Sequence, residues 1–297
     1  METLLREIHA DIAARQSHAA LYLEKNFKTR AETLDFLESD VIDRLDGLLL
    51  KHGNLPVLCS LKQSVEALKT RLEGVDRRLF QNLRQGIASG DCRGTSLRQK
   101  IMKIAGSRNQ ADDEYDNLDL LVSGLLLAEP APPDPGRPAP EMLFYQPTPV
   151  RIILALVDSA GFGPQDLFYD IGSGLGQVPI LAHLLSGVNA RGVEVVPAYC
   201  AYAGRSAKNL RLPRVRFTNL DARTTDYSQG SVFFLYTPFE GGVLETVLER
   251  LRRESENRSL RIYTYGPCTP QVSRHPWLLR QDDNGDIINR LALFKTQ

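Results

Sequence analysis

The sequence predicts an all-α region followed by an α/β region whose parallel sheet ends in a β-hairpin. Three observations support this. In the first half, apolar residues recur at helical spacing and β-branched alternation is nearly absent. In the second half, short apolar runs alternate with helical segments, as in parallel strands joined by helices. Near the end, the pair Asn284-Gly285 separates two more apolar runs, which is typical of a tight hairpin turn.

The first half is predicted to hold five or six amphipathic helices. The apolar stripes are Leu4, Ile8 and Ile12; Leu34, Leu37, Val41, Leu45 and Leu48; Leu61, Val65, Leu68 and Leu72; Val75, Leu79, Leu83 and Ile87; and Leu118, Leu121, Val122 and Leu125. Thr95-Ser96 and the pair Asp112 and Asp113 are the predicted caps of the last two helices. We interpret residues 1–127 as a helical domain that shapes the substrate entrance or forms a homodimer.

A proline-rich segment separates the two halves. Residues 128–140 read AEPAPPDPGRPAP and should form an extended linker, because proline disfavours both helix and central strand. Residues 141–297 are then the second domain. Its predicted strands are 167–171, 190–195, 215–218, 231–236 and 260–265 and the hairpin strands 277–281 and 287–294; its predicted helices are 147–160, 178–185, 197–210 and 243–253.

Composition excludes several classes of protein. Lys and Arg total 36, equal to Asp and Glu, so no overall field favours nucleic acid or an anionic membrane. The sequence has no long apolar run and its N-terminus lacks the apolar core of a signal peptide, so we expect a cytoplasmic protein. The four cysteines and five histidines are scattered without metal-ligand spacing, which predicts no metal site.

The stretch from Leu167 to Gln177 is the central motif of the second half. A short apolar run ends in Asp170 and opens into glycines 172, 174 and 176 before a helix-forming run. Glycine is needed where the backbone takes a positive φ or lies directly against a ligand. The D-x-GxGxG pattern differs from the GxGxxG of dinucleotide folds. A carboxylate at position 170 would repel a pyrophosphate but could bind the ammonium group of an amino acid, directly or through water.

These residues favour S-adenosylmethionine over NAD, and the loop resembles the first motif of the class I methyltransferases. The alternative is a glycine-rich turn that binds nothing. The resemblance implies a seven-stranded Rossmann-like methyltransferase sheet, and the closing hairpin resembles that family's last two strands. Residues 144–204 are most similar to the non-SET histone lysine methyltransferases. The cofactor-binding residues implied by the motif and the resemblance are Tyr145, Thr148, Asp170, Gly172, Ser173, Gly174, Gly176, Gln177, Glu194 and Asp221.

Two acids on the later strands have expected roles. Glu194 ends the second strand, where a carboxylate can accept two hydrogen bonds from a ribose diol. NAD enzymes place an acid there too, so Glu194 supports the fold more than the cofactor. Asp221 follows the third strand and resembles the methyltransferase residue that accepts a hydrogen bond from the adenine amino group.

The fourth strand ends in Tyr236-Thr237-Pro238-Phe239-Glu240, where the family usually places the methyl acceptor. Enzymes that act on adenine or glutamine have an Asn/Asp-Pro-Pro-aromatic tetrad there, and this chain departs from it. Tyr236, Thr237 and Glu240 are the candidate catalytic or substrate-contacting residues, with Glu240 a candidate base. The alternative is that this segment only turns the chain into the next helix.

The resulting interpretation is an S-adenosylmethionine-dependent methyltransferase that acts by in-line displacement on an unidentified small molecule or protein. Methyl transfer rests largely on proximity and alignment, so the absence of a catalytic triad or metal cluster in the sequence is compatible with it. The alternatives are a protein lysine methyltransferase, a noncatalytic cofactor-binding scaffold and, least favoured, a dinucleotide oxidoreductase. The strand-four segment lacks the asparagine-rich motif of the lysine enzymes.

Overall fold

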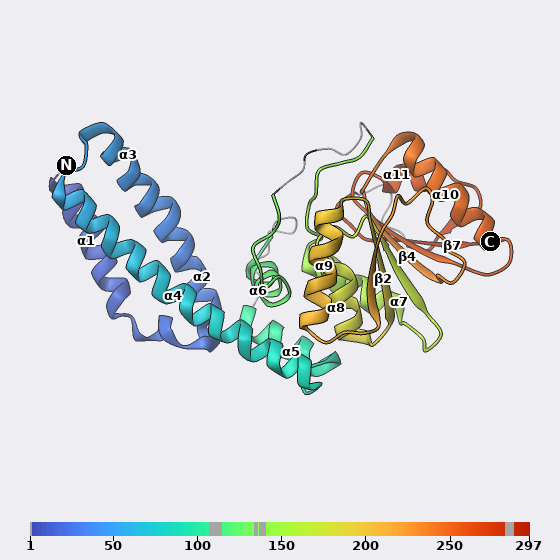
Figure 1. Ribbon diagram of the computed structural model, residues 1–297, viewed down its shortest axis with the longest axis horizontal. Coiled ribbons are helices and arrows are strands. Elements are labelled where there is room, and N and C mark those ends of the chain that lie inside the picture. The colour runs from blue at the N-terminus through green and yellow to red at the C-terminus, as the bar shows by residue number, and fades with distance from the viewer. Residues whose placement is uncertain (1, 107–114, 134–135, 137–140, 283–287) are drawn as a thin grey trace.

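The computed structural model describes the chain apart from residues 1, 107–114, 134–135, 137–140 and 283–287. Figure 1 shows an elongated arm of helices joined to an α/β body. The elements of the first half are α1 (Glu2–Ser17), η1 (Ala19–Tyr22), η2 (Glu24–Asn26), α2 (Phe27–Phe36), η3 (Leu37–Ile42), α3 (Asp43–His52), α4 (Pro56–Ser89), α5 (Gly94–Ala105) and α6 (Asn117–Leu126). The elements of the second half are α7 (Val150–Ala160), β1 (Leu167–Ile171), α8 (Gln177–Ser186), β2 (Asn189–Glu194), α9 (Pro197–Asn209), β3 (Val215–Asn219), β4 (Val232–Tyr236), α10 (Gly241–Ser255), β5 (Arg261–Tyr265), α11 (Thr269–Val272), β6 (Leu278–Arg280) and β7 (Ala292–Thr296).

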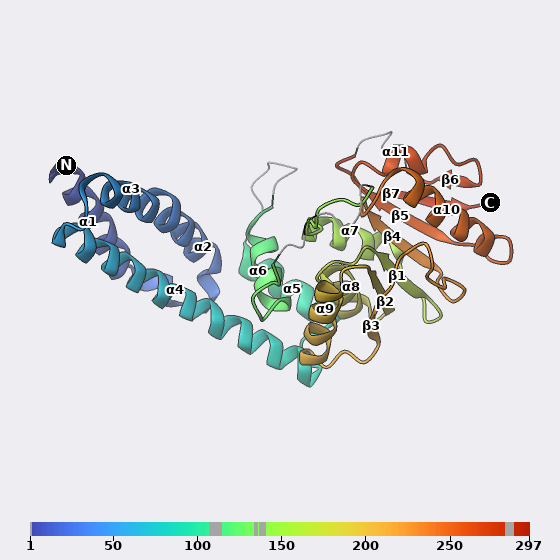
Figure 2. The ribbon, with the colours of Figure 1, turned by 45° about the horizontal axis from the view of Figure 1, so that its top comes forward.

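The helical half packs in two places. Helices α1 to α3 cover the first part of α4 and bury an apolar core of their own. The 34-residue helix α4 then continues through Gly74 without interruption. Its second part, with α5 and α6, shares a core with α7 and α8 of the α/β body (Figure 2). The division at the proline-rich segment therefore remains a prediction, because apolar packing is continuous across it.

Helices α5 and α6 do not begin at the capping residues that the sequence predicts. Thr95 and Ser96 lie inside the first turn of α5, which begins at Gly94 after Arg93. The predicted caps Asp112 and Asp113 lie outside the described residues, and α6 is capped by Asp116 instead. The Asp116 carboxylate accepts hydrogen bonds from the amides of Leu118 and Asp119. The Asp119 carboxylate accepts the Asp116 amide in return at 2.9 Å, which completes a capping box.

The predicted seven-stranded sheet is confirmed. The strand order is β3-β2-β1-β4-β5-β7-β6, with β7 antiparallel to both of its neighbours. The closing pair is formed by β6 and β7, as predicted, although β7 begins later than expected, at Ala292. The predicted Asn284-Gly285 turn lies outside the described residues. No described helix is long and apolar enough to cross a membrane.

Both faces of the sheet are covered, because alternate strand residues point to opposite sides. Leu167, Tyr169 and Ile171 of β1 pack in a core with α10 and α11. Phe168 packs on the other side with α7, α8 and α9. Asp170 lies two residues after Phe168, so it points to the same face of the sheet, and it is buried. The carboxyl ends of β1 and β4 meet where the strand order reverses, which is where open parallel sheets bind ligands.

Candidate cofactor site

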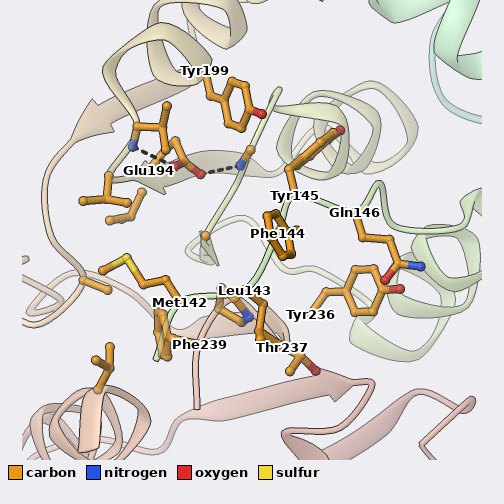
Figure 3. Close-up of a pocket in the computed structure, with 18 of the residues that line it drawn as sticks. Met142, Leu143, Phe144, Tyr145, Gln146, Glu194, Tyr199, Tyr236, Thr237 and Phe239 are labelled. Carbon is orange, nitrogen blue, oxygen red and sulfur yellow. Dashed lines mark hydrogen bonds between the residues drawn. The ribbon is translucent and has the colours of Figure 1, made fainter. Parts of the chain in front are cut away.

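A cavity of about 320 Å³ lies at the carboxyl ends of β1, β2 and β4 (Figure 3). Its volume falls within the roughly 300–1,000 Å³ of small-molecule pockets. Its lining includes Met142, Leu143, Phe144, Tyr145, Gln146, Gly172, Gly174, Val193, Glu194, Val195, Val196, Tyr199, Leu220, Asp221, Ala222, Tyr236, Thr237, Pro238, Phe239, Val243, Tyr265, Gly266, Pro267 and Asn289. Among the predicted residues, Thr148, Asp170, Ser173, Gly176, Gln177 and Glu240 do not line it.

The glycines of the loop after β1 are required by close approaches. Gly172 has φ 84°, and a Cβ there would lie 2.2 Å from Cβ of Pro238. Gly174 has φ 51°, and its Cβ would lie 2.3 Å from the ring of Tyr145. Both positions line the cavity. Gly176 instead packs against Phe217 and caps α8, so its position is explained by helix–strand packing.

Glu194 joins the end of β2 to the glycine loop. Its carboxylate accepts hydrogen bonds from the Gly174 amide at 2.7 Å and from the Val196 amide at 2.8 Å (Figure 3). Burial raises the pKa of Glu194, and the backbone N–H donors partly offset that rise. Each oxygen has a further lone pair, so the carboxylate can accept hydroxyl donors while it holds the loop.

Three buried polar groups around the loop have no hydrogen-bond partner among the residues that the structure describes. The Asp170 carboxyl receives no hydrogen bond from the described residues, and burial followed by repulsion from Glu194 raises its pKa well above the ordinary value. Ser173 Oγ and Gln177 Oε1 are also buried without a partner in the described structure. An unpaired carboxyl beside a second carboxylate is suited to a cationic ligand. This arrangement fits the ammonium-bearing cofactor that the sequence implies.

The other end of the cavity is apolar with one acid at its edge. Val195, Val196, Leu220 and Ala222 line this end. The carboxylate of Asp221 also lines it, but it pairs with Arg223 at 2.6 Å, which lowers the pKa of Asp221. Leu220 and Ala222, on either side of Asp221 in the sequence, can flank a nucleobase. The ion pair between Asp221 and Arg223 could not be predicted from the sequence, because it depends on the backbone conformation of the loop after β3.

Residues 141–149, which we call the strap, cross the cavity between the glycine loop and the end of β4 (Figure 3). The Tyr145 ring packs against that of Tyr199, with 5.4 Å between the ring centroids. Burial raises the pKa of Tyr145, which keeps its hydroxyl protonated. Thr148 is buried beyond the lining. Tyr199 was not predicted from the sequence, and its position in the first turn of α9 was the available signal.

The end of β4 forms the opposite wall. Tyr236 lies against Tyr265 of β5, with ring centroids 4.8 Å apart. Thr237 has φ 37°, a left-handed backbone that is uncommon for a threonine, and its hydroxyl donates to Tyr265 O while accepting from the Cys268 amide. Glu240 is exposed and directly precedes α10. The ring of Tyr236 thus faces the cavity, whereas the Thr237 hydroxyl is engaged within the protein.

Comparisons with known proteins agree with this geometry. Residues 143–235 match the family model described as "Histone methylation protein DOT1". No curated protein sequence matches the chain.

Solved structures with a related arrangement include an RNA methyltransferase from Salinibacter ruber in complex with S-adenosyl-L-homocysteine, at 22% identity and TM-score 0.39 over 51% of this chain and 92% of that one. Others are a geranyl diphosphate C-methyltransferase from Streptomyces coelicolor A3(2), at 16% identity and TM-score 0.38 over 50% and 77%, and a precorrin-6y C5,15-methyltransferase from Geobacter metallireducens GS-15, at 15% and 0.38 over 54% and 91%. Because the sequence identities and TM-scores are low, these structures add no support to the family match.

The family match covers residues 143–149 of the strap, the glycine loop, β2 and β4 as far as Leu235. The lining residues Met142, Tyr236, Thr237, Pro238, Phe239, Val243, Tyr265, Gly266, Pro267 and Asn289 lie outside the matched range. The strand order and the antiparallel β7 fit the class I methyltransferase sheet that the sequence implies. The α/β part of the chain is therefore an S-adenosylmethionine-dependent methyltransferase.

Proposed function

We propose that this methyltransferase acts on the side-chain amine of a lysine in a protein. The observation that carries the proposal is a group of aromatic lining residues beyond the glycine loop, formed by Phe144 and by the paired rings of Tyr236 and Tyr265 (Figure 3). The acids among the described lining residues are Glu194 and Asp221, and Glu194 lies across the cavity from Tyr236 (Figure 3). Aromatic faces attract an alkylammonium group and exclude water from it. The matching family model is described by histone methylation, which favours a protein acceptor.

The chemistry follows from this arrangement. The bound cofactor supplies an electrophilic methyl group on a sulfonium. Glu194 and the glycine loop would hold the cofactor. The Asp170 carboxyl, which is buried behind the lining residues, would offer a negative charge to the ammonium group directly or through water. Burial raises the pKa of Tyr236, so its phenol stays protonated and is no base near neutral pH. The amine must therefore lose its proton to water before its side chain reaches the aromatic residues, and the site then contributes by aligning the neutral amine.

Arrays of lysine-containing peptides incubated with radiolabelled cofactor test the acceptor. We expect label on lysine peptides and none on the matched arginine peptides. Label confined to small-molecule pools would contradict the protein acceptor. Binding of cofactor with no turnover on any cell fraction would favour the noncatalytic scaffold instead.

Two substitutions at Tyr236 separate its ring from its hydroxyl. Tyr236→Phe keeps the aromatic face, so we expect kcat within about threefold of the wild type. Tyr236→Ala removes the face and should lower kcat/KM for the acceptor by roughly tenfold, the loss of about 1.4 kcal/mol of contact. Steady-state kinetics on the identified peptide measures both. A larger loss in Tyr236→Phe than in Tyr236→Ala would refute recognition by the ring.

Two further sequence predictions belong to this proposal. The protein is proposed to work in the cytoplasm and to dimerise through its helical half. Sedimentation equilibrium of the full chain tests the second, and a monomer at all concentrations would exclude the dimer.

A further inference from the structure

The strap is fastened at its first residue by the α10 side of the sheet. The carboxylate of Glu141 accepts a hydrogen bond from the Val243 amide at 2.8 Å, in the first turn of α10. The Glu240 amide donates to Glu141 O at 3.0 Å, and Met142 forms an antiparallel bridge with Phe239. A carboxylate at a helix N-terminus meets amides that lack partners inside the helix and a favourable dipole. The first end of the strap is therefore held by the loop between β4 and α10.

The other end of the strap is fastened by α6, which belongs to the N-terminal half. Asp119 Oδ1 accepts the Val150 amide at 2.6 Å, at the start of α7. The Tyr115 hydroxyl donates to Pro147 O. Leu127, directly after α6, packs in the same apolar cluster as Tyr145. Three separate contacts thus connect α6 and the residues that flank it to the strap and to the residue that follows the strap.

Helix α6 is in turn fixed on α4. Arg84 of α4 donates from Nε to Leu125 O at 2.8 Å and also to Gly124 O. A Cβ on Gly124 would lie 2.3 Å from the ring of Phe80, so the two helices pack at close range. The strap therefore has a rigid support that reaches into the helical half.

We propose that α6 clamps the strap over the cofactor, with Asp119 and Tyr115 as positioning residues that hold Tyr145 against Gly174. Neither residue is among those that line the cavity. Asp119 contacts Asp116 and Val150, so an effect of its replacement on cofactor binding should pass through α6 and the strap. The Tyr115 hydroxyl also interacts with Tyr236, which lines the cavity, so for Tyr115 the hydrogen exchange of the strap must accompany the affinity measurement. The inference rests on S-adenosylmethionine occupying the cavity, and it does not depend on the identity of the acceptor.

The test compares Asp119→Ala and Tyr115→Phe with a matched control in the full chain. The control, Asp158→Ala, removes the Arg98–Asp158 ion pair, which also joins the helical half to α7 but leaves the strap alone. Binding of S-adenosylhomocysteine is measured by calorimetry, and hydrogen exchange is followed in peptides that cover residues 141–150. We expect Asp119→Ala to bind roughly tenfold more weakly and Tyr115→Phe about threefold, each with faster exchange in the strap. Asp158→Ala should match the wild type in both measurements.

The outcomes separate a clamp from general destabilisation. Asp119→Asn keeps one oxygen that can accept the Val150 amide, so it should recover most of the affinity that alanine loses. Wild-type affinity and exchange in Asp119→Ala, or an equal loss in Asp158→Ala, overturns the clamp. If Asp119→Ala does not fold, Tyr115→Phe decides, and wild-type affinity there overturns the proposal. A wild-type protein that binds no S-adenosylhomocysteine refutes the cofactor assignment and the clamp together.

Discussion

Replacing Glu194 with alanine is expected to weaken cofactor binding by about 1–3 kcal/mol, and to destabilise the free protein as well. The carboxylate has two tasks in the structure. It holds the amides of Gly174 and Val196, and it presents its remaining lone pairs to the cavity. Alanine leaves two inward-facing N–H groups unpaired and the cofactor's hydroxyls without an acceptor. Titration with S-adenosylhomocysteine and thermal unfolding of the free protein measure the two losses separately.

Glu194→Gln distinguishes the two tasks. Its single amide oxygen can accept one of the two backbone N–H groups, so the free protein should regain part of its stability. Cofactor binding should stay weak, because the amide nitrogen of glutamine is a donor and cannot accept a hydrogen bond from a hydroxyl group of the cofactor. Asp221→Ala should have a smaller effect on binding, since the Asp221 carboxylate is already paired with Arg223. Wild-type affinity in both Glu194 variants would remove Glu194 from the cofactor site.

The parts of the site that are local in sequence could be predicted from it. The glycine loop combines a strand, a turn and a helix start within eleven residues, and the apolar run, the three glycines and the helix-forming run after them indicated each part. Glu194 could be predicted because parallel strands end at one edge of the sheet. Both inferences need only the neighbouring residues and the rule that relates strand direction to ligand position.

The rest of the site depends on partners distant in sequence. Glu141 meets α10 about a hundred residues later, and Asp119 meets α7 across the proline-rich segment. Neither acid differs by local pattern from an ordinary acid on the protein surface. The Thr237 hydroxyl was predicted to face substrate, but its partner Tyr265 lies on another strand. The sequence identifies the chemistry of each side chain. Tertiary packing determines whether that side chain bonds to the protein or faces the ligand.

Asp170→Asn is expected to have opposite effects on stability and on binding. The wild-type carboxyl is buried without a hydrogen-bond partner in the described structure, beside Glu194 and near Tyr145. A neutral amide removes the charge, so thermal unfolding should show a free protein more stable by on the order of 1–2 kcal/mol near neutral pH. Binding of S-adenosylmethionine should weaken by about 1–3 kcal/mol, because the ammonium group loses its carboxylate.

The sign of the pH dependence provides a second check on Asp170. Because the pKa of Asp170 is raised in the folded protein, the stability of the wild type falls as pH rises from the ordinary aspartate range through the folded pKa. The stability advantage of Asp170→Asn must therefore grow over that interval and vanish below it. Cofactor affinity should move the other way, since a cation binds the ionised carboxylate, so wild-type affinity rises with pH through the same interval. Glu194 titrates in both the wild type and Asp170→Asn. The difference in stability or affinity between the two proteins at each pH therefore reports on Asp170. An affinity difference independent of pH would mean that the Asp170 charge takes no part in holding the cofactor.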